Sequence, residues 1–168
     1  MTMEAIGGHD GMTVYRTPEG IHKVAETDLE ISHLLREASA LSHMQGEHAP
    51  KLLDLNTLER WTLQEDLGPA LSLDSNPIVA LGAERFFGDC IDLLRSLRNN
   101  GIYHGDLTPP NLAWVEGRGL CALDWLESSL IGEVAPRKRL TTDAWQLLDT
   151  YMGLMGGCAA IQFAGSVR

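Results

Sequence analysis

The first part of the chain alternates apolar and polar residues in short runs, which predicts a small antiparallel sheet with one helix. Thr13–Arg16 and Ile21–Val24 are two such runs, and the Pro and Gly between them favour a turn. Residues 28–41 carry apolar side chains at helical spacing, and either Thr27 or Asp28 at the start of this stretch can be the N-cap of a helix. Lys51–Leu55 and Trp61–Gln64 have the length and composition of two further strands of this sheet.

The remainder of the chain predicts helices around a second, shorter hairpin. Residues 82–97 have an apolar stripe at helical spacing, and Gly101 stands where a helix can end in the left-handed conformation. Leu112–Val115 and Leu120–Leu123 are apolar runs joined by a segment with two glycines, which indicates a β-hairpin. Another helix is expected to begin directly after Thr141 or Thr142, either of which can be its N-cap. Together these elements predict an α+β protein.

The composition is that of a folded protein with an acidic surface. The chain has 168 residues, of which 44% are hydrophobic, and this suffices for one domain or for two small lobes that share a cleft. Its 23 acidic and 13 basic residues give a net charge of −10, which argues against a broad nucleic-acid surface. A cationic substrate or a basic partner would suit this charge, although solubility alone would also explain it.

The cysteines, the histidines and the lack of long apolar runs bear on where the protein acts. Cys90, Cys121 and Cys158 are unclustered, so they are predicted to be reduced thiols and not disulfides or metal ligands. The six histidines lack a zinc-ligand spacing. The first ten residues contain no signal segment, and no apolar run is long enough for a membrane span. We therefore expect a cytoplasmic protein, with delivery into another cell left open.

A group of polar residues between positions 104 and 124 is the strongest chemical signal in the sequence. His104 and Asp106 are followed by Asn111, and Asp124 comes directly after the second run of the predicted hairpin. Antiparallel pairing of that hairpin brings Asn111 and Asp124 together, so both could reach one metal ion. Phosphoryl transfer from ATP needs such a set: one carboxylate near the accepting hydroxyl, and an amide and a carboxylate on Mg²⁺. The alternative is that Asp106 and Asn111 only cap a tight loop with two prolines.

This segment resembles the catalytic and metal-binding loops of the protein-kinase-like superfamily. Its H-G-D form and D-W ending are similar to RIO-type kinases, the small kinase of the KEOPS complex, lipopolysaccharide kinases and aminoglycoside phosphotransferases. The resemblance implies that Asp106 is the catalytic base, that Asn111 and Asp124 bind magnesium, and that ATP is the phosphate donor. Gly105 replaces the arginine that is common in regulated protein kinases, and Trp125-Leu126 replaces Phe-Gly. Activation by loop phosphorylation is therefore not expected.

The same resemblance assigns roles in the first part of the chain. A glycine-rich loop is expected before the first hairpin, and in the family such a loop covers the ATP phosphates. The glycines concerned are Gly7, Gly8 and Gly11. Lys23 falls where the family has a strand lysine that pairs with the phosphates. Glu37 falls where a helix glutamate holds that lysine, and Glu30 is the second choice. The alternatives are a plain turn for the glycines and solvated surface charges for the glutamates.

The resemblance also divides the chain into two lobes of one catalytic domain. Residues 1–67 match a small N-terminal lobe with the antiparallel sheet and one helix, and residues 68–168 match a trimmed, mostly helical C-terminal lobe. The segment from Glu65 to Leu67 resembles the hinge, whose main chain binds adenine; the alternative is an acidic loop. Asp143 resembles the aspartate that ties its helix back to the catalytic loop, although it could simply favour the helix dipole.

The resemblance implies an ATP- and magnesium-dependent phosphotransferase with a bilobal kinase-like fold. Small-molecule phosphotransferases build their acceptor pocket from inserted and later helices that are not seen here. A minimal Ser/Thr protein kinase, with a protein substrate or partner, is therefore favoured. A small cationic acceptor would fit the acidic charge, and a RIO-like ATPase is also open. The missing A-P-E signature would suit a nucleotide-binding pseudokinase that acts as an interaction module. The sequence does not indicate the acceptor or the oligomeric state.

Overall fold

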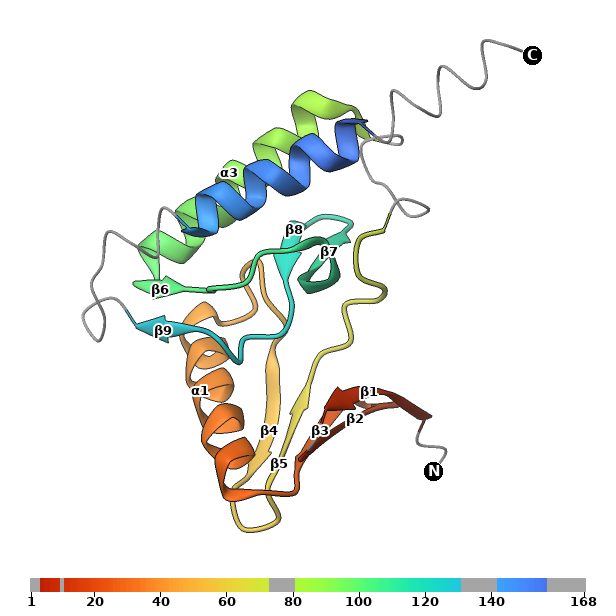
Figure 1. The fold of residues 1–168 in the computed structure, drawn as a ribbon, viewed down its shortest axis with the longest axis vertical. Helices are drawn as coiled ribbons and strands as arrows, with labels where there is room; N and C mark the ends of the chain where they lie inside the picture. Colours follow the sequence, from red (N-terminus) through yellow and green to blue (C-terminus); the bar gives the residue numbers. More distant parts are fainter. Residues whose placement is uncertain (1–3, 10, 73–80, 131–141, 157–168) are drawn as a thin grey trace.

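The structure of the chain is a computed structural model that describes residues 4–9, 11–72, 81–130 and 142–156. Its first strands are β1 (Glu4–His9), β2 (Met12–Thr17), β3 (Gly20–Ala25), β4 (Leu52–Asn56) and β5 (Trp61–Gln64). They form one antiparallel sheet in the order β1-β2-β3-β5-β4, and helices pack beside it, so the fold is of the α+β class (Figure 1). The strands predicted from the sequence pattern are confirmed to within one or two residues.

The glycine-rich segment before the first hairpin lies largely in a strand, and the prediction of a loop there was wrong. Gly7 and Gly8 belong to β1 and pair with Val14 and Thr13 of β2. Gly8 has a φ of +133°, and a Cβ at this position would collide with the carbonyl oxygen of Met12. Glycine therefore allows the two strands to approach closely. Pairing with β2 also satisfies backbone groups that a loop would leave to water.

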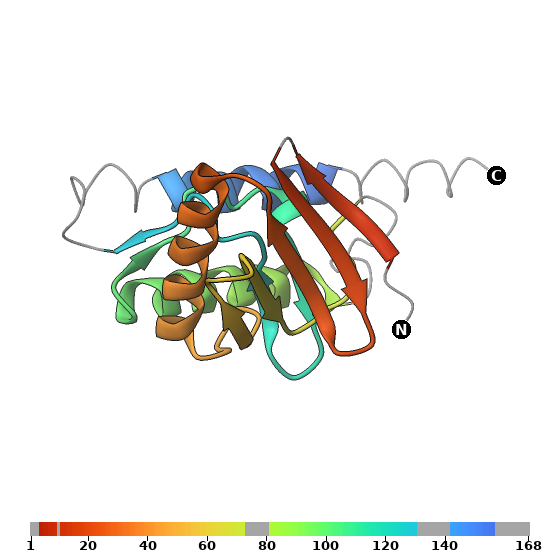
Figure 2. The same cartoon turned by 90° about the horizontal axis from the view of Figure 1, so that it is seen from below.

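Helix α1 (Asp28–Met44) covers one side of the sheet, where it packs on β3, β4 and β5 (Figure 2). Thr27 is its N-cap, and the hydroxyl of Thr27 accepts a hydrogen bond from the Glu30 N–H. Leu34 of the predicted apolar stripe is buried, whereas Leu35 is 42% exposed. Successive residues point about 100° apart around a helix, so the two leucines cannot both face the sheet.

The second part of the chain consists of helices packed around short strands. Its elements are α3 (Ala83–Asn99), β6 (Ile102–Tyr103), the 3-10 turn η1 (Pro109–Asn111), β7 (Leu112–Val115), β8 (Gly119–Ala122) and β9 (Ser129–Leu130). The predicted hairpin is confirmed as β7–β8, while β6 pairs with β9, which is too short to predict from a pattern. A further helix covers residues 142–156 and is blue in Figure 1. The ring of Tyr151 in this helix contacts the rings of Phe86 and Phe87 in α3.

The main hydrophobic core joins the two parts of the chain. Leu41 and Met44, near the end of α1, pack with α3, with the hairpin β7–β8 and with Trp125. A smaller apolar cluster lies between β2, β3 and α1. The sheet is therefore fixed to the second part of the chain through the last turns of α1, and side chains from both parts can form one site.

Several expectations concern thiols, charges and membrane contact. Cys90 and Cys121 are free and buried, as predicted. Cys158, Thr141 and the basic cluster at 137–139 lie outside the described residues. Within the described chain, no helix combines the length and the hydropathy that crossing a bilayer requires.

Candidate functional site

A cavity of about 500 Å³ opens between the five-stranded sheet and the hairpin β7–β8. Its walls come from β1, β2 and β3, from the segment that follows β5, and from the residues that directly precede β7 and directly follow β8. The predicted site residues that line it are Gly7, Lys23, Glu65, Leu67, Asn111 and Asp124. The fold therefore gathers side chains from distant parts of the sequence around one hollow.

Of the three predicted glycines, Gly7 is part of the cavity lining and the other two are not. Gly8 packs against the backbone of Met12 inside the β1–β2 hairpin. Gly11 faces the side chain of Thr27 at the start of α1. The roof of the cavity at this place is strand β1, not a continuous glycine loop.

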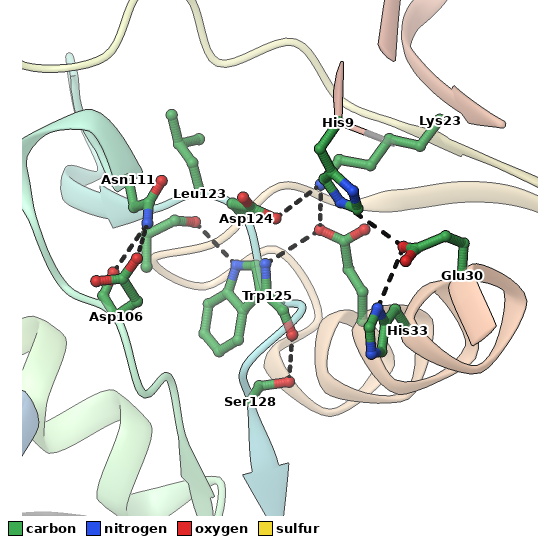
Figure 3. A network of polar contacts seen from close by, with 12 residues as sticks. His9, Lys23, Glu30, His33, Asp106, Asn111, Leu123, Asp124, Trp125 and Ser128 are labelled. Carbon is green, nitrogen blue, oxygen red and sulfur yellow. Dashed lines mark hydrogen bonds and ion pairs between the residues drawn. The ribbon is translucent and has the colours of Figure 1, made fainter. Parts of the chain in front are cut away.

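Lys23 is the central cation of the site (Figure 3). Its Nζ lies 2.7 Å from Glu37 Oε1 and 3.2 Å from Asp124 Oδ1. Glu37 is fully buried, and its Oε1 also accepts a hydrogen bond of 3.1 Å from the Trp125 N–H. Glu37 is thus the lysine partner, as the sequence indicated first, and it joins α1 to the segment around Asp124.

Glu30, the second choice for this role, belongs to a separate cluster. Its Oε2 lies 3.2 Å from His33 Nδ1 and 3.6 Å from His9 Nε2 (Figure 3). These contacts connect the end of β1 with the first turns of α1.

The Lys23 ammonium keeps its charge inside the protein. Burial alone would lower its pKa, but the charges of Glu37 and Asp124, and the hydrogen bonds to both, outweigh burial and raise the pKa. Lys23 is therefore cationic at neutral pH, and it lines the cavity.

Asp106 and Asn111 form the second polar pair of the site (Figure 3). Asn111 Nδ2 donates to Asp106 Oδ2 at 2.7 Å and to the Asp106 carbonyl at 3.2 Å. The amide group thus closes the loop, as the alternative interpretation expected, and it also fixes the direction of the Asp106 carboxylate. The amide nitrogen makes both contacts, and Asn111 Oδ1 has no hydrogen-bond donor among the described residues, so this oxygen can serve as a ligand.

Asp124 has a φ of +53°, in the left-handed region, which Asp tolerates better than most residues. The Leu123 N–H donates to the Asn111 carbonyl at 2.8 Å, so the hairpin ends hold Asn111 and Asp124 beside each other at the cavity.

Among the described residues, no group of three or more His, Cys, Asp or Glu could hold a metal by itself. An amide and a carboxylate are nevertheless typical protein ligands of Mg²⁺ when phosphate oxygens and water supply the rest. The donor set therefore fits a magnesium–nucleotide complex.

His104 connects the Asp106 loop with the Asp124 segment. Its Nδ1 accepts a hydrogen bond of 3.3 Å from the Asp106 N–H, and its Nε2 donates to the Leu123 carbonyl at 2.8 Å. The ring is buried and meets the Trp125 ring edge-on. Burial lowers the His104 pKa to about 4, so the ring is neutral at pH 7. The sequence placed His104 in the motif but gave it no role.

The helix at 142–156 supports the same loop. Asp143 accepts hydrogen bonds from the His104 N–H at 3.0 Å and from the Gly105 N–H at 2.8 Å. This confirms the tie that the sequence suggested for Asp143. Gln146, one turn later, accepts from the Leu107 N–H at 2.9 Å. Sequence reasoning missed Gln146, whose only signal is its spacing of three from Asp143.

The segment after β5 closes the far end of the cavity. Leu67 lines the cavity, and its N–H makes no hydrogen bond to another residue of the described chain. Glu65 is held by Arg118, whose guanidinium lies 2.9 Å from Glu65 Oε2. Arg118, in the turn of the hairpin β7–β8, also donates to the carbonyls of Gly46 and Ala49. Nothing in the sequence distinguished Arg118 from a surface arginine.

A second cavity, of about 350 Å³, lies on the other side of η1. Pro109 and Thr108 line it from the loop, and Gln146, Asp149 and Thr150 line it from the helix at 142–156. Pro110 and Asn111, the next residues of the same turn, line the first cavity. The loop that begins at Asp106 therefore separates two hollows.

We expect His104 to make the protein less stable in acid. Its folded pKa of about 4 lies below the ordinary 6.5, so between these pH values the unfolded chain binds a proton that the folded chain does not. The free energy of unfolding should fall by about 3 kcal/mol from this group as the pH drops from 6.5 to 4. Urea unfolding at several pH values, compared for wild type and His104→Gln, measures the difference. His43→Gln, at an exposed position, is the control, and parallel curves for wild type and His104→Gln would contradict the prediction.

The comparisons with known proteins add no family to this geometry. No protein-family model matches the chain, and the search of curated proteins finds no match either.

Proposed function

We propose that this protein is an ATP- and magnesium-dependent phosphotransferase of the protein-kinase-like superfamily. The observation that carries the proposal is the position of Lys23, held between the buried Glu37 and Asp124 at the wall of a cavity that Asn111 also lines. A fixed cation beside a carboxylate and an amide suits a triphosphate with its metal ion, because phosphoryl transfer depends on positioning and on neutralising charge.

Each polar side chain then has one task. Lys23 pairs with the phosphates, and Glu37 holds Lys23 in place. Asn111 and Asp124 would hold Mg²⁺, which neutralises the charge that develops on the phosphate oxygens. Asp106, oriented by Asn111, aligns the accepting hydroxyl and takes its proton late in the reaction. The adenine lies against the main chain of Glu65 to Leu67, where the Leu67 N–H has no protein partner in the described chain.

In this proposal the chain has two lobes, residues 1–67 and 68–168, which meet at the 500 Å³ cavity. The cavity supports this division, because its walls come from both segments. The buried, free thiols of Cys90 and Cys121 suit a reducing, cytoplasmic setting.

The acceptor that we propose is a Ser or Thr hydroxyl of a protein. The second cavity supports an acceptor on this side of the Asp106 loop, because it adjoins η1 opposite the proposed nucleotide cavity. Thr108 and Pro109 offer it a largely apolar floor, and Asp149 adds one carboxylate. A segment with an apolar residue and a basic residue beside the hydroxyl would meet both features.

The test is to incubate the purified protein and candidate acceptors with Mg²⁺ and ATP, and to measure intact masses and ADP in the same tube. We expect ADP together with a gain of one phosphate on a protein. ADP without a protein mass gain would replace the protein kinase with an ATPase or a small-molecule kinase. The absence of both ADP formation and nucleotide binding would overturn the proposal, and nucleotide binding without turnover would favour a pseudokinase.

A further inference from the structure

Gln64 is a buried polar residue at the cavity that the proposed mechanism does not use. It is the last residue of β5, and its side chain lines the cavity directly before the Glu65–Leu67 segment. Only 3% of the residue is exposed, and its Nε2 has no hydrogen-bond partner within the described chain. A buried donor without an acceptor destabilises a protein, so such a group calls for an explanation.

The register of the sheet shows that Gln64 faces the cavity. Gln64 is paired with Ile21 across the β3–β5 ladder, and Thr62 is paired with Lys23. Directly paired residues have their side chains on the same face of a sheet. Ile21 and Lys23 both line the cavity, so the Gln64 carboxamide lies on the cavity side and not on the opposite face.

We propose that Gln64 is a specificity residue that selects adenine over guanine, an inference that rests on the proposed function. A carboxamide presents one donor and one acceptor side by side. The N7 and the N6 amino group of adenine present the complementary acceptor and donor, whereas N7 and O6 of guanine are both acceptors. In the proposed pose, N1 of adenine accepts a hydrogen bond from the Leu67 N–H, and N6 and N7 lie on the side of Gln64, which lines the same cavity. Guanine in the same position would place its O6 against the carboxamide oxygen of Gln64, and two acceptors cannot form a hydrogen bond with each other.

The experiment compares binding of ATP, GTP and 7-deaza-ATP, in which a C–H replaces N7 without changing the shape of the base. Wild type should bind ATP roughly 5- to 100-fold more tightly than either analogue, the range expected for one bidentate contact to a base. Gln64→Met keeps an unbranched side chain of similar length but has no donor or amide oxygen. This variant should bind ATP and 7-deaza-ATP equally, and its preference for ATP over GTP should shrink. Gln45→Met, the same exchange at an exposed residue, should retain the wild-type preferences.

Equal binding of ATP and 7-deaza-ATP to wild type would overturn the role of Gln64 and leave the proposed function standing. An unchanged preference in a folded Gln64→Met variant would overturn it as well. If Gln64→Met fails to fold, the comparison of ATP with 7-deaza-ATP on wild type alone decides whether Gln64 has this role. Failure of wild type to bind any of the three nucleotides would overturn the proposed function itself, and with it this inference.

Discussion

Asp106→Asn is expected to reduce turnover by about 10²- to 10⁴-fold while Mg-ATP binds as in wild type. The substitution removes the carboxylate that takes the proton of the accepting hydroxyl. It keeps an oxygen that can accept the 2.7 Å hydrogen bond from Asn111 Nδ2, so the loop retains its shape. Single-turnover kinetics with the acceptor measure the chemical step, and calorimetric titration with Mg-ATP measures affinity.

The matched control for this prediction is Asp92→Asn. Asp92 is exposed on α3 and pairs with Arg95 at the surface, where a salt bridge contributes little. Turnover of Asp92→Asn should equal that of wild type. Equal turnover of wild type and Asp106→Asn would show that Asp106 is not the base, whatever the nucleotide affinity.

Asp124→Ala is expected to abolish the use of metal-bound ATP, with a loss of roughly 10³-fold or more. Asp124 supplies the carboxylate of the proposed magnesium site and one of the two partners of Lys23. Lys23 retains Glu37 at 2.7 Å, so the buried cation stays paired in the variant. Titration with Mg²⁺ at fixed ATP, followed by binding and by ADP release, measures the metal dependence.

The left-handed backbone at Asp124 requires a second variant. Alanine is disfavoured at a φ of +53°, whereas asparagine tolerates it and has a similar size. Asp124→Asn removes the charge with little strain, so it should lose the magnesium-dependent activity while its thermal unfolding stays close to that of wild type. Full activity of a folded Asp124→Asn variant would refute the metal role.

The parts of the site that local sequence determines were predicted well. The runs that became β7 and β8 are short and bounded by glycine, and their pairing places Asn111 and Asp124 at the cavity. Lys23 lies in a strand and Glu37 in a helix with clear periodicity. The strand-helix packing that joins them follows from burying the apolar face of α1.

The parts that depend on long-range contacts could not be predicted. Arg118 binds carbonyls about seventy positions earlier in the chain, and no local pattern carries that information. Gln64 is ordinary in a strand, and only its unpartnered amide and its register mark it. Gly7 and Gly8 seemed to form a loop because glycine weakens a strand, but the pairing with β2 outweighs that preference.

The hydrogen bonds that Asp143 accepts from the His104 and Gly105 N–H groups have a consequence for the order in which the protein matures during synthesis. The carboxylate that holds the His104 and Gly105 amides is 39 and 38 residues further along the chain than those amides. A nascent chain that ends at Leu130 already contains Lys23 and the four acidic and amide side chains of the site, which are Glu37, Asp106, Asn111 and Asp124. It lacks the partner that orients their loop. Translation, at about 5–20 residues per second, therefore delivers the side chains before it delivers the contact that holds their loop.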